Sequence, residues 1–105
     1  MSKPQRKLAT ILATDCVNYS GMMENNEEET VIGIKACRNI IEDTIEEYGG
    51  RVFNTAGDSV IAEFSSPVDC VNAGIEFQKL ISDRNNNIAV NRKMEFRIGV
   101  HLDDV

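Results

Sequence analysis

The chain has 105 residues, and we assign residues 1–105 to a single domain, because a second independent core would not fit in this length. Hydrophobic residues make up 42% and charged residues 27%, a balance that excludes a wholly disordered chain. Acidic residues outnumber basic residues by 17 to 11, which gives a net charge of -6. That surplus argues against nucleic-acid binding, since domains that neutralise phosphates carry a basic face.

Membrane and disulfide signals are also missing from the sequence. No apolar run approaches the roughly 18 to 20 residues that span a bilayer, so we expect no membrane span. The cysteines Cys16, Cys37 and Cys70 form an odd, widely spaced set without a CxxC pair, which predicts neither a disulfide framework nor a zinc site. Reduced cysteines are typical of a reducing compartment, and we expect a cytoplasmic protein.

The first half of the chain predicts a strand, a loop and a long helix. Residues 7–14 are mostly apolar, as in a buried strand, and residues 16–21 contain interleaved turn formers that predict a loop. The helix runs from about Asn26, an N-cap residue followed by three glutamates, to Tyr48 before a glycine pair. Its apolar residues recur at three- and four-residue spacing, so one face is apolar.

The second half predicts a hairpin, a second helix and a last strand. Residues 51–54 and 59–64 are strand-like and flank the polar turn 55–58. The second helix runs from about Pro67 to Arg84 and is opened by the N-cap residue Ser66. Residues 95–102 alternate between polar and apolar, the pattern of a strand with one solvated face.

The order strand, helix, strand, strand, helix, strand predicts an α+β, ferredoxin-like βαββαβ fold. Its four-stranded antiparallel sheet carries both helices on one face. The two strands that begin each βαβ half lie side by side and antiparallel in the centre of such a sheet. The end of the first strand then lies beside the start of the third, so we expect Asp15 and Asp58 to meet at the same edge.

Two carboxylates at one sheet edge are a candidate divalent metal site. Each would resist ionising beside the other unless a cation lay between them, and Mg²⁺ typically uses one or two protein carboxylates together with water and phosphate oxygens. The alternative is that both residues are ordinary turn acids, Asp15 ending a strand and Asp58 lying in a hairpin turn. The spacing of the two residues leaves both interpretations open.

Three ordered segments of the chain resemble class III nucleotidyl cyclases. Residues 8–20, an apolar strand followed by Asp15, resemble the first metal-binding segment of this family. Residues 49–64, with a Gly-Asp turn, are similar to the second metal-binding segment, and residues 95–102 are similar to the strand that follows it. The resemblance covers almost the whole chain and is closest to the bacterial adenylate cyclase branch.

The resemblance implies the N-terminal, metal-carrying part of a lyase domain that converts ATP, in preference to GTP, into a cyclic nucleotide and diphosphate. Two Mg²⁺ or Mn²⁺ ions would assist the attack of the ribose 3′-hydroxyl on the α-phosphate. It also implies a homodimer with shared active sites. Asp15 and Asp58 would be the catalytic metal carboxylates, with the backbone carbonyl of Cys16 as a further metal ligand. The segment implied to bind the phosphates comprises Val17, Asn18, Tyr19 and Ser20.

The sequence departs from the family pattern at two positions of this implied site. Asn54 stands where adenylate cyclases commonly carry the lysine that reads the purine, and Asn18 replaces a glycine of the phosphate loop. The Asn and Arg residues that stabilise the transition state in the family would lie beyond Val105, which implies that this chain alone is inactive. The alternatives are a catalytically degenerate, cyclase-like dimerisation or regulatory module, and another palm-like two-metal enzyme.

Overall fold

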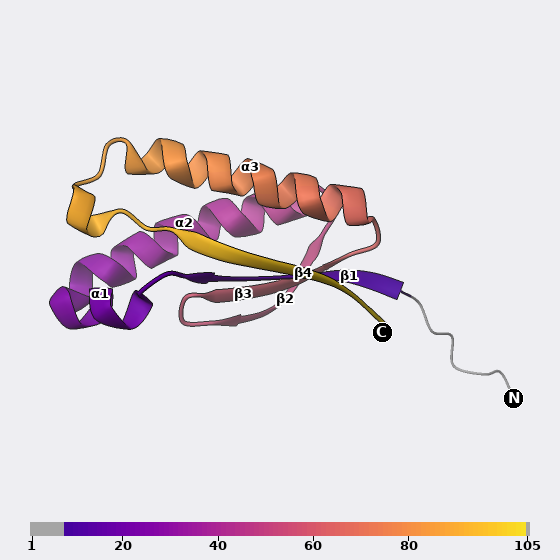
Figure 1. The fold of residues 1–105 in the computed structure, drawn as a ribbon, viewed down its shortest axis with the longest axis horizontal. Helices are drawn as coiled ribbons and strands as arrows, with labels where there is room; N and C mark the ends of the chain where they lie inside the picture. The colour runs from indigo at the N-terminus through magenta and orange to yellow at the C-terminus, as the bar shows by residue number, and fades with distance from the viewer. Residues whose placement is uncertain (1–7, 105) are drawn as a thin grey trace, which may run out of the picture.

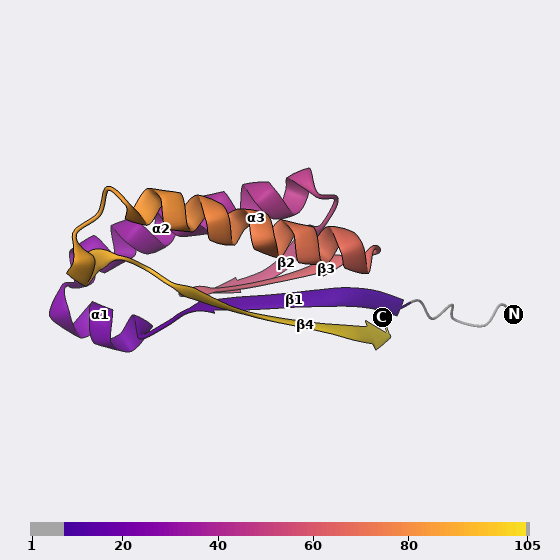
Figure 2. The same ribbon diagram turned by 45° about the horizontal axis from the view of Figure 1, so that its top comes forward.

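The structure, a computed structural model, describes residues 8–104 and contains one four-stranded antiparallel sheet (Figure 1). Its strands, in the spatial order β2-β3-β1-β4, are β1 (Leu8–Cys16), β2 (Arg51–Ala56), β3 (Ser59–Phe64) and β4 (Phe96–Asp104). The long helices α2 (Glu27–Glu47) and α3 (Pro67–Asn85) cover one face of this sheet (Figure 2). The predicted α+β, ferredoxin-like arrangement is therefore confirmed.

Two short elements were not predicted. Helix α1 (Tyr19–Asn25) occupies part of the expected loop, and the short 3₁₀ helix η1 (Val90–Arg92) precedes β4. Helix α1 has seven residues and no side-chain cap, so its formation depends on packing: Tyr19 and Met22 contact the core, and the Thr30 hydroxyl donates to the Met22 carbonyl at 2.9 Å. The prediction of a plain loop here was wrong because a helix this short leaves almost no periodic signal.

The predicted boundaries shift by a few residues. Strand β1 extends to Cys16, and the hairpin turn is shortened to Gly57 and Asp58, since β2 reaches Ala56. Residue 7, the predicted first residue of the first strand, lies outside the described residues. Both predicted N-caps are confirmed, because the side chains of Asn26 and Ser66 each accept a hydrogen bond at 3.1 Å from the backbone N–H three residues later.

The core lies between the helices and one face of the sheet. Alternate side chains of β1 point toward the helices, among them Leu12 and Cys16, and β3 contributes Val60, Ala62 and Phe64 to the same layer. Ile11, Ala13 and Asp15 therefore point to the face that carries no helix. The buried helix residues packed into this core include Ile34, Cys37, Ile41, Ile45, Ala73, Phe77 and Ile81.

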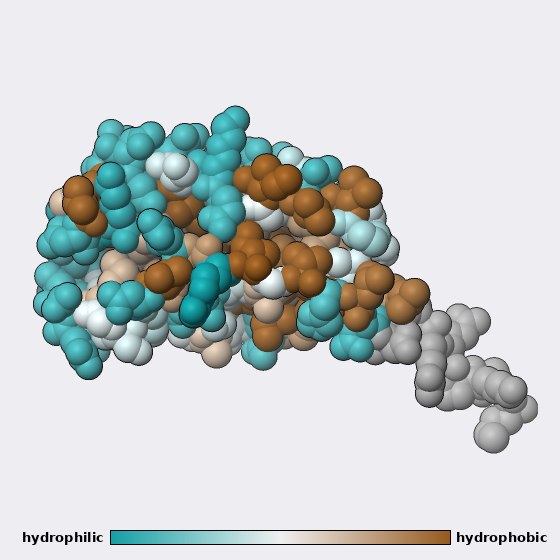
Figure 3. Space-filling view, in the orientation of Figure 1, coloured by the Kyte–Doolittle hydropathy of each residue, from teal (hydrophilic) through white to brown (hydrophobic). Residues whose placement is uncertain are grey.

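Exposed apolar side chains gather over α3 and the edge strand β4, as the brown area in Figure 3 shows. Val100 and Leu102 of β4 lie on the helix-bearing side of the sheet, opposite Leu12 and Thr10, but remain 45% and 61% exposed. Val71 and Ile75 of α3 line a groove of about 370 Å³ beside Val100. Among the described residues, no helix is both long and apolar enough to cross a membrane.

Two glycines, the buried Gly74 and the half-buried Gly50, give a test of the packing between helices and sheet. A Cβ added at Gly74 in α3 would make ordinary contacts, 3.5 Å from Ile98, whereas a Cβ at Gly50 would lie 2.5 Å from the ring of Phe64. We therefore expect Gly74→Ala to stabilise the fold by about 0.5–1 kcal/mol through helix propensity. Gly50→Ala should destabilise it by about 1–3 kcal/mol through overpacking. Urea denaturation of both variants measures the two effects, and equal effects would contradict the packing described here.

Candidate functional site

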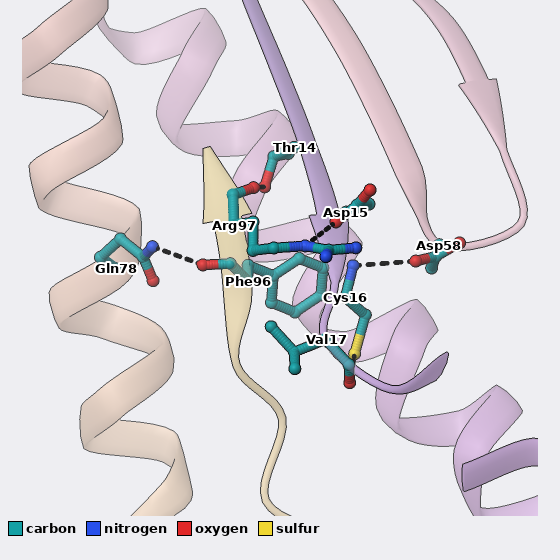
Figure 4. Close-up of polar contacts among 8 residues, drawn as sticks. All are labelled: Thr14, Asp15, Cys16, Val17, Asp58, Gln78, Phe96 and Arg97. Carbon is teal, nitrogen blue, oxygen red and sulfur yellow. Dashed lines mark hydrogen bonds and ion pairs between the residues drawn. The ribbon is translucent and has the colours of Figure 1, made fainter. Parts of the chain in front are cut away.

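Asp15 lies near the end of β1, on the face of the sheet without helices. The antiparallel register places it opposite Arg97 of β4, and the Nε of Arg97 donates to the Oδ1 of Asp15 at 2.9 Å (Figure 4). The side chains of Asp15 and Arg97 are 42% and 68% exposed. An ion pair this open to water adds little stability, so the carboxylate can change its partner at low cost.

Asp58 lies in the two-residue turn between β2 and β3, at the same end of the sheet as Asp15 (Figure 4). Its Oδ2 accepts a hydrogen bond from the backbone N–H of Cys16 at 2.8 Å, although 42 positions separate the two residues in sequence. The predicted meeting of the two acidic segments at one sheet edge is thus confirmed as geometry.

A shallow hollow of about 340 Å³ opens on the helix-free face beside these residues. Asp15 and Arg97 line one side of it, and Ser59 and Ile61 of β3 line the other. Gly99 of β4 lies in its floor with no side chain, which keeps the surface low between the charged groups. The hollow therefore offers a space with charges of both signs next to the strand ends.

The thiol of Cys16 takes no part in this polar face. Its side chain points into the core, where burial and, secondly, the nearby Asp58 carboxylate raise the pKa of the Cys16 thiol to about 11. Cys16 is therefore a neutral thiol at pH 7, and any contribution to a metal has to come from its backbone, as predicted. Burial likewise raises the pKa of Cys37 and Cys70.

The predicted phosphate segment is the connection from β1 into α1. The N–H of Val17 already donates to the carbonyl of Glu95 at 2.8 Å, so it is engaged within the sheet end. Asn18 adopts a left-handed conformation with φ of 58° and ψ of 34°, and Tyr19 and Ser20 begin α1. This conformation is compatible with asparagine in place of the glycine of the family pattern, since asparagine tolerates the left-handed region better than most other non-glycine residues.

Asn54 lies on β2 after a β-bulge. The register passes from Val52 opposite Ala62 to Asn54 opposite Ile61, so Phe53 is the extra residue. Asn54 therefore shares the helix-free face with Ile61 and Asp15, although it does not line the hollow itself. The structure thus places the predicted purine-reading position on the same face as the carboxylates, one strand further out.

Sequence reasoning missed Arg97. Arg97 could have been found from the strand register. The last strand pairs antiparallel with β1, and the residue that this pairing places opposite Asp15 is a cation. Within the part of the chain that the structure describes, no cluster of three or more His, Cys, Asp or Glu side chains could hold a metal ion. Any metal here would thus rely on the two carboxylates, on a backbone carbonyl and on non-protein oxygens.

The chain has similar relatives of known class. It is 35% identical over 102 residues, 96% of its length, to "Putative adenylate cyclase 3" of Rhizobium meliloti (strain 1021). The crystal structure of an adenylate/guanylate cyclase/hydrolase from Silicibacter pomeroyi superposes with a TM-score of 0.84 at 30% identity. The chain is related to class III adenylyl and guanylyl cyclases.

This relationship covers only part of those proteins. The chain spans 17% of the Rhizobium relative, and 95% of the chain matches 59% of the Silicibacter cyclase structure. A bacterial light-regulated adenylyl cyclase has the same fold, with a TM-score of 0.87 and 21% identity over 98% of this chain and 32% of that one. No protein-family model matches the chain. The expected resemblance to the cyclase family is thus confirmed for a partial domain.

The left-handed conformation of Asn18 is testable through stability. Asn18→Gly should leave the free energy of unfolding within about 0.5 kcal/mol of the wild type, because glycine adopts this region readily. Asn18→Val should lower it by about 1–2 kcal/mol, because a β-branched residue pays a steric cost there. Asn72→Val, on the exposed face of α3, is the matched control and should have little effect. Similar losses for the two valine variants would contradict the assigned conformation.

Proposed function

We propose that this chain is the metal-carrying part of a nucleotidyl cyclase catalytic domain that converts ATP to cyclic AMP and diphosphate. The observation that supports this most is the juxtaposition of Asp15 and Asp58 at one end of the paired strands β1 and β3, with the Cys16 amide joined to Asp58. A hollow lined by Asp15 and Arg97 opens beside this sheet end and leaves room for a ligand. The relationship to cyclases gives the pair a chemical role.

The donor set fits Mg²⁺ or Mn²⁺. Both ions prefer carboxylate oxygens, and Mg²⁺ takes most of its remaining ligands from water and substrate phosphates, so a site with two protein carboxylates is sufficient. The exposed Asp15–Arg97 pair can open without a large loss, which makes the Asp15 carboxylate available to a metal. The backbone carbonyl of Cys16 is the proposed third protein ligand.

In the proposed reaction the chain positions groups rather than forming covalent bonds. The 3′-oxygen bonds to the α-phosphorus, the bond to the leaving diphosphate breaks, and the hydroxyl proton leaves to solvent. Bound divalent ions lower the pKa of the attacking hydroxyl and offset the charge of the leaving group. Asp15 and Asp58 would hold the metals at the strand ends, and the backbone N–H groups of Asn18, Tyr19 and Ser20 would be available to bind the triphosphate.

Substrate choice and assembly are further parts of the proposal. ATP is preferred because the curated relative is named an adenylate cyclase, while the shorter, uncharged Asn54 weakens that preference. A homodimer is proposed in which each protomer completes the other's site across the helix-free face. Because the chain matches part of its relatives, turnover is assigned to a complete domain and not to these 105 residues alone.

Metal binding by this chain is the direct test. Asp15→Asn and Asp58→Asn should each raise the Kd for Mn²⁺ at least about tenfold, because each removes one of two charged ligands. Electron paramagnetic resonance of free Mn²⁺ measures this without substrate. The fold should keep its stability within about 1 kcal/mol, since Asp15 loses only an exposed ion pair and an asparagine oxygen at position 58 still accepts from Cys16.

Asp83→Asn, on the exposed end of α3, removes the same charge away from the site and should leave Mn²⁺ affinity unchanged. If the wild-type chain binds no Mn²⁺, or if all three variants behave alike, the metal site is contradicted. In that case the degenerate dimerisation or regulatory module becomes the better description of the chain.

Base selection is tested at Asn54 in a complete cyclase domain that contains this chain. Asn54→Lys should raise ATP turnover relative to GTP turnover by about threefold or more, because a lysine reaches further than asparagine and can donate to N1 of adenine, whereas N1 of guanine carries a hydrogen and accepts nothing. Thr55→Lys, on the same strand but opposite Val60 and hence on the other face, is the control. An unchanged ATP-to-GTP ratio in Asn54→Lys would show that this position does not read the base.

A further inference from the structure

The turn that carries Asp58 has a second attachment, which comes from helix α2. Gly57 and Asp58 are the two turn residues between Ala56 and Ser59, and Gly57 has a positive φ of 57°. Neither turn residue belongs to the strand pairing, so the ladder alone does not fix the direction of the Asp58 side chain. Contacts from outside the hairpin have to do so.

Arg38 of α2 supplies such a contact. Its Nη1 donates to the carbonyl oxygen of Gly57 at 3.4 Å. That carbonyl belongs to the peptide group that joins Gly57 to Asp58, so a donor on it restrains the rotation of this peptide plane. The Cys16 N–H restrains the side chain of Asp58 by donating a hydrogen bond to its carboxylate at 2.8 Å. Asp58 is thereby held at its backbone and at its side chain, by two different elements.

The Arg38 side chain is a costly way to fill its position. Its Nε is buried and has no hydrogen-bond partner among the described residues. A buried donor without a partner opposes folding, and an apolar side chain of similar length would avoid that penalty. The Arg38 guanidinium donates to the Asp58 turn through Nη1, so packing alone does not account for an arginine here.

We propose that Arg38 is a positioning residue that holds the Gly57–Asp58 turn, so that the Asp58 carboxylate points at the Cys16 amide and at the metal position. Its importance for metal binding rests on the function proposed above. The orientation of Asp58 does not, because it is a property of the chain without any ligand. The two parts can therefore be measured separately.

The experiment compares Arg38→Met and Arg38→Lys with Lys35→Met in the 105-residue chain. Lys35 is exposed on the same helix one turn earlier, so its variant removes the same charge without touching the turn. The first readout is the Cys16 amide in ¹⁵N-correlated NMR spectra, whose chemical shift and exchange protection report its bond to Asp58. The second is Mn²⁺ affinity, and the third is thermal unfolding.

We expect Arg38→Met to keep or raise the unfolding temperature, because the unpartnered buried Nε is gone. The same variant should shift the Cys16 amide and lower its protection, and it should weaken Mn²⁺ binding by roughly tenfold, as loss of an outer-shell partner does. Arg38→Lys should lie between Arg38→Met and the wild type. Lys35→Met should match the wild type in all three measurements.

Other outcomes overturn the proposal. An unchanged Cys16 amide in Arg38→Met would show that Arg38 does not orient Asp58. If Arg38→Met lowers the unfolding temperature and reduces exchange protection equally at all amides, the role of Arg38 is purely structural. If Arg38→Met does not fold, the same comparison is made with Arg38→Lys. If the wild type binds no Mn²⁺, the proposed function fails, while the Cys16 amide still decides whether Arg38 positions Asp58.

Discussion

The antiparallel pairing of β1 with β3 is the constraint on which the rest of the site depends. The paired residues run from Thr10 opposite Phe64 to Thr14 opposite Val60. Just beyond this last pair, the N–H of Cys16 bonds to the Asp58 carboxylate, where a continued ladder would have offered a carbonyl. The Asp58 carboxylate thus replaces a backbone carbonyl as the hydrogen-bond acceptor at the point where the two strands diverge. This hydrogen bond attaches the acidic turn to the end of the sheet.

The two carboxylates are held in different ways, and this difference has chemical consequences. Asp58 is restrained by a backbone donor, which moves only if the sheet end moves, whereas Asp15 is paired with a long, exposed arginine side chain. The two acids are thus not unpaired, as Asp15 contacts the Arg97 guanidinium and Asp58 the Cys16 amide. A site with one fixed and one exchangeable carboxylate combines a defined position with a low cost of opening.

The sequence predicted those features that depend on local pattern. Helix α2 was predicted from the Asn26 cap and apolar spacing, and the sheet-end meeting of Asp15 and Asp58 from element order alone. The features that it missed depend on contacts between distant segments. Arg97 matters only through its register with β1, and Arg38 only through the way α2 crosses the hairpin. The bulge at Phe53, which sets the face of Asn54, leaves no periodic signal in six residues.

The resemblance implies a homodimer, and the composition of the helix-free face indicates what kind of contact this face could make. Ile11 and Ala9 are already buried within the sheet, at 8% and 4% exposure, and the cross-strand neighbours of Ile11 are Glu63 and His101. The exposed apolar side chains lie instead over α3 and β4 (Figure 3). The exposed charges of Asp15 and Arg97 at the hollow would lose water in a dry interface, and the small apolar area around them does not offset that cost. Any assembly on this face therefore has to be wet and polar, held by ion pairs and bridging water, and such contacts leave room for a charged ligand between protomers.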